Sequence, residues 1–220
     1  MKANKNNVSK NTKSKSNAVL TTITTADHPI ESLPFPPFLP PQATVMCMGT
    51  FPPAADKRAM QFHYPNFQND MWRIYGLIFF NDTDYFRKGE EKAFDADKIK
   101  AFLTEKGIAS CPTVWQAIRE KGNASDAFLT VVDPVHIHEV LATIPNCQYI
   151  GTTGGKATEV LLNLADNTVK LPKTGESIEL KFSSRHIKLT RLPSTSRAYP
   201  LSLTKKAEAY KQFFQSVGLL

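Results

Sequence analysis

Two loop-like segments carry most of the residues whose types and spacing could do chemistry. The first runs from Gly49 to Trp72 and gathers five rings in one stretch, namely Phe51, Phe62, His63, Tyr64 and Phe67. Exposed aromatics in a loop are costly unless they stack on a partner, and a nucleobase is one, worth about 1–3 kcal/mol per stacked base. The alternative is that these rings form a small core beneath the loop.

The second segment runs from Leu192 to Pro200 and places three hydroxyls, Ser194, Thr195 and Ser196, directly before Arg197. Hydroxyls and backbone N–H groups donate to phosphate oxygens, and an arginine adds charge, so this turn suits a phosphodiester. Arg197 or Tyr199 could also wedge into the stack vacated by a flipped base. The alternative is a solvated Ser/Thr/Pro loop.

A weaker signal lies at Thr152–Ala157, where Gly154 and Gly155 precede Lys156. A glycine turn before a helix lets backbone N–H groups face an anion, but the nucleotide-binding glycine fingerprints are absent. The other metal-ligating and nucleophilic residue types form no pattern: the three cysteines lie far apart, and His136 and His138 point to different helix faces. We therefore expect no metal site.

These segments lie between predicted strands and helices. Apolar runs predict strands at 43–49 and 148–153 and a strand pair within 177–192, whereas helical patterns cover 69–80, 95–106, 113–121, 136–144, 156–164 and 204–217. Alternating strands and helices predict an α/β fold with three layers, α/β/α, around a short, mainly parallel central sheet. Ligands of such sheets bind at the carboxyl ends of the strands. The segments 49–69, 152–156 and 192–200 all follow predicted strands and should meet there.

Composition sets the domain organisation and the expected surroundings. Residues 1–27 form a polar, lysine-rich tail that cannot bury enough surface to order itself, residues 28–42 carry six prolines and form an extended lead-in, and 43–220 form a single domain. The net charge is +7, but five of these charges are lysines within the first sixteen residues, so charge favours nucleic acid only slightly. No apolar run suits a membrane or a signal peptide, and no heptads occur, so a cytoplasmic monomer is expected.

The ordered motifs resemble the uracil-DNA glycosylase superfamily over residues 43–217. The similarity is closest to the branch of hypoxanthine (deoxyinosine) DNA glycosylases and more distant to the mismatch-specific enzymes. It rests on Gly49-Thr50-Phe51-Pro52-Pro53, Phe62-His63-Tyr64-Pro65, Asn69-Asp70-Met71-Trp72, Thr153-Gly154-Gly155-Lys156-Ala157 and Leu192-Pro193-Ser194-Thr195-Ser196. A middle segment from Gly107 through Arg119 to Ser125-Asp126 is also similar to the hypoxanthine branch.

The resemblance implies a monofunctional DNA glycosylase of base-excision repair. Such an enzyme flips a deaminated base, uracil or hypoxanthine, into its pocket and hydrolyses the N-glycosidic bond without metal or cofactor; its partner is DNA containing the damaged base. The resemblance assigns base binding to Phe51, Phe62, His63 and Thr153. It assigns DNA binding to Ser194, Thr195, Ser196, Arg197 and Lys156, and leaves catalysis to Asn69, Asp70 and Tyr64.

The sequence departs from the superfamily pattern at polar positions. Phe51 stands where several branches keep an Asp or Asn that positions water, Pro53 replaces a glycine, and Thr153 replaces an asparagine. His63 and Asn123 are then further candidates for the chemistry, while Asn69 and Asp70 equally suit helix caps. Two alternatives follow: a binder of damaged DNA that has lost catalysis, and an enzyme of nucleotide metabolism on the same fold.

Overall fold

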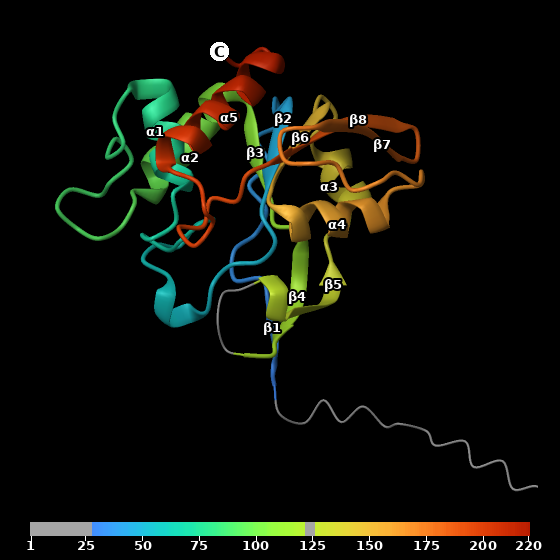
Figure 1. Cartoon of the computed structure of the whole chain (residues 1–220), viewed down its shortest axis with the longest axis horizontal. Helices are drawn as coiled ribbons and strands as arrows, with labels where there is room; N and C mark the ends of the chain where they lie inside the picture. The colour runs from blue at the N-terminus through green and yellow to red at the C-terminus, as the bar shows by residue number, and fades with distance from the viewer. Residues whose placement is uncertain (1–27, 122–125) are drawn as a thin grey trace, which may run out of the picture.

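The computed structural model describes residues 28–121 and 126–220, and its centre is a five-stranded sheet (Figure 1). The strand order is β3 (Ile108–Ser110), β2 (Val45–Met48), β6 (Tyr149–Thr153), β8 (Arg185–Leu192) and β7 (Ser177–Phe182). All neighbouring strands are parallel except β7, which pairs antiparallel with β8. The predicted mainly parallel sheet is confirmed.

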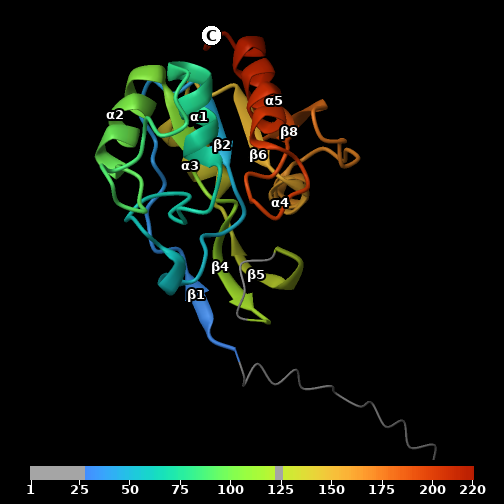
Figure 2. The same ribbon diagram turned by 60° about the vertical axis from the view of Figure 1, so that its left-hand side comes forward.

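Helices cover both faces of this sheet (Figures 1 and 2). One face packs against α1 (Met71–Phe80), α2 (Ala96–Lys106) and α5 (Leu203–Ser216), and the other against α3 (Ile137–Thr143) and α4 (Gly155–Leu164). The pleat of β2 explains the division: Val45 and Cys47 join the first core, whereas Met46 and Met48 join the second. The predicted three-layer α/β/α architecture is therefore confirmed.

A second, antiparallel sheet corrects one sequence prediction. Its order is β1 (Ile30–Ser32), β4 (Val114–Arg119) and β5 (Leu129–Pro134), and it lies below the main sheet in both views (Figures 1 and 2). The helix predicted over 113–121 is wrong because this segment is β4. Its Val, Trp and Ile side chains suit a strand, and pairing on both sides satisfies its backbone. The predicted closing residue, Gly122, lies outside the described residues.

The other predicted elements are present, with small changes at their ends. Helix α2 starts at the Asp95 side chain, which accepts from the backbone N–H groups of Asp97 and Lys98 at 3.1 and 3.0 Å, and it ends at Gly107, whose φ is +63°. Helix α5 is capped by Ser202 instead of the predicted Thr204. The Pro-rich stretch 28–42 contributes the short edge strand β1, whose prolines stay outside it. Within the described ranges, every helix is too short or too polar to cross a membrane.

Candidate functional site

A cavity of about 690 Å³ lies where β2, β6 and β8 end. It is lined by all three loops that the sequence placed at this edge. The predicted site residues that line it are Phe51, His63, Tyr64, Asn69, Thr153, Ser194, Thr195, Ser196 and Arg197. The predicted residues Phe62, Asp70 and Lys156 do not line it. We call the side formed by 49–53, Tyr64 and Thr153 the cavity wall, and the segment 194–200 the rim loop.

Tyr64 forms much of the cavity wall. Its backbone is left-handed, with φ of 52°, a conformation that is unusual for a large side chain and recurs at functional sites. Its ring contacts Gly49 and lies edge-on to Trp72 at 6.0 Å between centroids, and its hydroxyl is 3.5 Å from Thr153 Oγ1. Burial raises the pKa of Tyr64 well above its usual value. Tyr64 is therefore a neutral, fixed aromatic face.

Phe51 supplies a second ring to the cavity wall. It packs against the small core beneath β4, and the guanidinium of Arg119 lies 5.3 Å from its centroid. Arg119 also pairs with Glu31 of β1 at 2.8 Å and donates to the carbonyl of Pro52. The small sheet thus fixes the loop that follows β2.

Phe62 corrects the prediction that it stacks on a base. The residue is 3% exposed, and its ring lies 4.8 Å from the His63 ring and 6.0 Å from the Trp72 ring in the aromatic core. A ring occupied by such neighbours has no free face for a ligand. For Phe62, the small core that the sequence allowed as an alternative is correct, while Phe51 and Tyr64 line the cavity.

His63 is buried and held on both nitrogens. Its Nε2 lies 3.1 Å from the Pro36 carbonyl, which can only accept, so Nε2 carries the proton and Nδ1 accepts from the Ser110 hydroxyl at 2.7 Å. Burial is the main cause that lowers the pKa of His63 to about 4. The imidazole is therefore neutral near pH 7 and has no nitrogen left for proton transfer.

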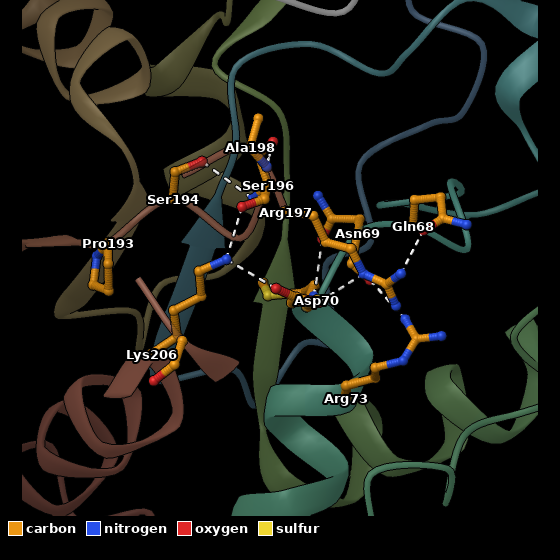
Figure 3. A network of polar contacts seen from close by, with 12 residues as sticks. Gln68, Asn69, Asp70, Arg73, Pro193, Ser194, Ser196, Arg197, Ala198 and Lys206 are labelled. Carbon is orange, nitrogen blue, oxygen red and sulfur yellow. Dashed lines mark hydrogen bonds and ion pairs between the residues drawn. The ribbon is translucent and has the colours of Figure 1, made fainter. Parts of the chain in front are cut away.

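An ion-pair network holds the rim loop to the protein (Figure 3). The Asp70 carboxylate accepts from Lys206 Nζ at 2.8 Å and pairs with Arg197 Nε at 3.4 Å. Lys206 is fully buried and also donates to the Ser196 carbonyl at 2.7 Å, and Arg197 additionally donates to the Gln68 side chain. Asp70 therefore anchors the rim loop. This contradicts the predicted catalytic role, because both carboxylate oxygens are engaged outside the cavity.

Asn69 is the residue whose side chain starts helix α1. Its Oδ1 accepts from the backbone N–H of Met71 at 2.9 Å, whereas Asp70 at the N-cap position makes no side-chain cap. The cap alternative is thus confirmed for Asn69 and wrong for Asp70. Since the oxygen is used, the amide N–H₂ of Asn69 is the part that can donate into the cavity.

The rim loop keeps its hydroxyl hydrogens available. Ser194 Oγ accepts from the Ser196 backbone N–H, and Ser196 Oγ accepts from that of Ala198, both at 3.2 Å. A hydroxyl that accepts one hydrogen bond still has its own hydrogen to donate. Thr195 is buried, and its carbonyl accepts from the Asp70 N–H at 2.9 Å. Donors and charge suited to a phosphate are therefore presented at a fixed edge.

Sequence reasoning assigned no role to Thr50 and Asp126. Thr50 Oγ1 donates to Asp126 Oδ2 at 2.9 Å, and both residues line the cavity. Asp126 is an exposed residue, yet partial desolvation of its carboxyl at the cavity raises its pKa. The Thr50 hydrogen bond and the charges of Lys156 and Arg119 act in the opposite direction and lower that pKa. Lys156, in the first turn of α4, thus acts on the site only as a nearby charge. The sequence marked Asp126 only as part of the middle segment that is similar to the hypoxanthine branch. Its place in the site, through the loop before β5, is given by the structure.

The described residues contain no group of three His, Cys, Asp or Glu side chains placed to hold a metal ion.

Comparisons with known proteins support the fold. No protein-family model matches the chain, and no curated protein matches it either. Among solved structures, it is similar to the solution NMR structure of a protein from Methanosarcina acetivorans that carries the provisional description uracil DNA glycosylase. The TM-score is 0.57 at 18% identity, over 86% of this chain and 99% of that one. The two chains share a fold across nearly the whole of that protein.

Proposed function

We propose that this protein is a monofunctional DNA glycosylase of the uracil-DNA glycosylase superfamily that removes a deaminated base, uracil or hypoxanthine. One observation carries the proposal: a single cavity joins an aromatic wall to a rim of free hydroxyl donors and a half-exposed arginine. This combination suits a nucleobase and the phosphates on either side of it. The shared fold and the ordered sequence motifs support it.

The cavity dimensions suit a flipped nucleotide. Its volume of about 690 Å³ lies within the range of about 300–1,000 Å³ that is usual for small-molecule pockets. The rings of Tyr64 and Phe51 offer apolar faces to a base, and Thr153 and the Asn69 amide offer hydrogen bonds to its edge. Donors aimed at the base stabilise the negative charge that it carries away when the glycosidic bond breaks.

The rim loop is the proposed contact with the DNA backbone. Ser194 and Ser196 donate to phosphate oxygens, and Arg197 either pairs with a phosphate or enters the gap left by the base. Lys156 adds positive charge beside the cavity. Because phosphate contacts release counterions, we expect binding to weaken steeply as salt is raised.

The activity is tested by incubating the full chain with duplexes and single strands that carry uracil, hypoxanthine or xanthine, followed by alkali at abasic sites. The proposal predicts strand scission for at least one of these lesions and none for undamaged DNA. The absence of strand scission on every one of these substrates would refute the proposed glycosylase activity.

A second candidate function rests on Phe51. This ring occupies the position at which several branches of the superfamily place a polar residue that holds water, and a phenyl ring holds none. A binder of damaged DNA that lacks catalysis would show salt-dependent, lesion-selective binding by fluorescence anisotropy without base release. Thermal stabilisation by free nucleosides, with indifference to DNA, would instead indicate an enzyme of nucleotide metabolism.

A further inference from the structure

The proposed reaction needs a group that holds water and faces positive charge. The sugar becomes cationic as the base departs, so a carboxylate next to C1′ stabilises it. Most polar candidates in the cavity are otherwise engaged: Tyr64 is neutral, His63 has both nitrogens bonded, and the Asn69 oxygen caps α1. Among the described residues that line the cavity, Asp126 contributes the one carboxyl group.

Thr50 fixes the position of this carboxyl. Thr50 is buried directly after the end of β2, and its carbonyl accepts from Val114 N at 3.1 Å, while the Gly49 carbonyl accepts from Thr113 N at 2.7 Å. Its hydroxyl then donates to Asp126 Oδ2 at 2.9 Å. Within residues 28–121 and 126–220, the other oxygen, Oδ1, has no hydrogen-bond partner and is free to bind water.

The charges around Asp126 suit a base that ionises. Asp126 is an exposed residue, but its side chain lines the cavity. Partial desolvation there opposes the charged form of the carboxylate, whereas the hydrogen bond from Thr50 and the charges of Lys156 and Arg119 favour it. A raised pKa brings a general base nearer to the working pH. The Phe51 ring lines the same cavity and offers water no hydrogen bond, so water bound there is held by polar groups such as the Asp126 carboxyl.

We propose that Asp126 is the catalytic carboxylate of this site, positioned by Thr50, and that it takes over the role for which Phe51 is unsuited. This assignment rests on the proposed glycosylase function. Water bound to Oδ1 attacks C1′, the C1′–N bond breaks and its electron pair leaves with the base, and the water proton passes to Asp126. The base then takes up a proton from solvent, and the products are the free base and an abasic sugar.

The first test compares single-turnover rates of Asp126→Asn with those of Asp97→Asn, an exposed residue that loses the same charge. We expect Asp126→Asn to be at least about 100-fold slower, in the range of general-base losses, with DNA affinity within about 3-fold of the parent protein. Asp126→Glu should restore part of the rate, and Thr50→Val should lower it by a smaller factor. Unchanged rates for Asp126→Asn in a folded protein would overturn the assignment.

A pH profile separates chemistry from structure. The rate of the parent protein should fall on the acidic side as Asp126 is protonated, and this limb should be missing in Asp126→Asn. A limb that persists unchanged in the variant assigns the titration to another group and overturns the proposal.

A binding experiment tests, without turnover, whether the Asp126 carboxylate faces a cationic sugar. A duplex with a cationic pyrrolidine abasic analogue mimics the charged sugar, and a tetrahydrofuran analogue is its neutral match. We expect the parent protein and Asp97→Asn to prefer the cation by about 10-fold, and Asp126→Asn to lose the preference. If none of these proteins excises any lesion, the proposed glycosylase activity is refuted, but the preference for the cationic analogue still tests whether Asp126 faces the sugar. An equal preference in the parent protein, Asp97→Asn and Asp126→Asn overturns the role of Asp126.

Discussion

The rim loop and the cavity wall border the same cavity but are held by different forces. The rim loop is anchored by charge: Lys206 and Arg197 both engage the buried carboxylate of Asp70. The cavity wall is held by ring packing and neutral hydrogen bonds around Tyr64 and His63. Charge fixes the part that we propose to contact a polyanion, and neutral contacts fix the part that we propose to contact a flat base. The two parts should therefore fail separately when each is perturbed.

Lys206→Met should have the largest effect because it removes the buried lysine that holds the rim loop through Asp70 and the Ser196 carbonyl. It leaves the Asp70 carboxylate buried beside the exposed Arg197 only, and removing one partner of a buried pair costs about 3–5 kcal/mol. Chemical denaturation measures the loss, and DNA binding should fall with it. Lys205→Met, at an exposed neighbour, serves as the control. The double variant with Asp70→Asn should recover part of the stability; a double variant no more stable than Lys206→Met would argue against the anchor.

Acid should loosen the cavity wall through His63. The pKa of this imidazole is about 4 in the folded protein against an ordinary 6.5, so between these values the unfolded chain binds the proton and the folded one does not. Stability is thus full above pH 6.5 and falls as pH decreases towards 4, by up to about 3 kcal/mol at 1.36 kcal/mol per pKa unit. Urea unfolding of the parent protein, His63→Gln and the exposed-site control His186→Gln checks this. A curve for His63→Gln as steep as the parent's over this window would exclude His63 as the cause.

Gly49→Ala should disturb the wall while leaving the rim loop intact. A Cβ at Gly49 would lie 3.0 Å from Tyr64 Oη and 3.2 Å from its Cε1, so the ring must move. Overpacking of this kind costs about 1–3 kcal/mol, and base-dependent binding should weaken more than binding to undamaged DNA. Anisotropy with damaged and undamaged duplexes measures the two. Adding Tyr64→Leu should relieve the strain without restoring lesion preference; a restored preference would show that the ring is not the recognition element.

Arg197→Ala should have the smallest effect on the fold and test the rim loop as a ligand for phosphate. The Arg197 side chain is 48% exposed, so the loss in stability should be within about 1 kcal/mol. DNA affinity should fall about 10-fold, and the slope of log affinity against log salt should become shallower by about 1. Arg87→Ala, whose ion pair is also partly exposed, is a suitable control. An unchanged salt slope in Arg197→Ala would place the phosphate contact elsewhere.

Sequence reasoning located the edge of the sheet where the cavity lies because that edge follows from local signals. Glycine ends β2 and opens the turn after β6, and the strand pair 177–192 delivers the rim loop to the same place. Parallel strands with helices on both faces then bring these three segments together. Hydrophobic periodicity gave the wrong element at 113–121, because a short segment with Val, Trp and Ile fits either a helix or a strand. Pairing with β1 and β5 makes this segment a strand.

The roles of individual side chains depended on contacts that no local pattern contains. Phe62 and Tyr64 are two positions apart, yet the first is sealed in the core and the second lines the cavity. Asp70 directly precedes α1, as a helix cap would, but its carboxylate is paired with Lys206, which lies far along the chain. Asp126 meets Thr50 across 76 positions, so its place in the site follows only from the tertiary fold.

The pairing of Asp70 with Lys206 also has a consequence for the order in which the protein is made. The two residues are separated by 136 positions, and α5 emerges from the ribosome only after all five strands of the central sheet. Until it does, the Asp70 carboxylate has no lysine to pair with, and the Ser196 carbonyl lacks its donor. A nascent chain that already contains the residues of the cavity wall therefore lacks the ion pair that holds the rim loop. Docking of α5 therefore completes the anchor of the rim loop, and chains that stop before Lys206 would lack it.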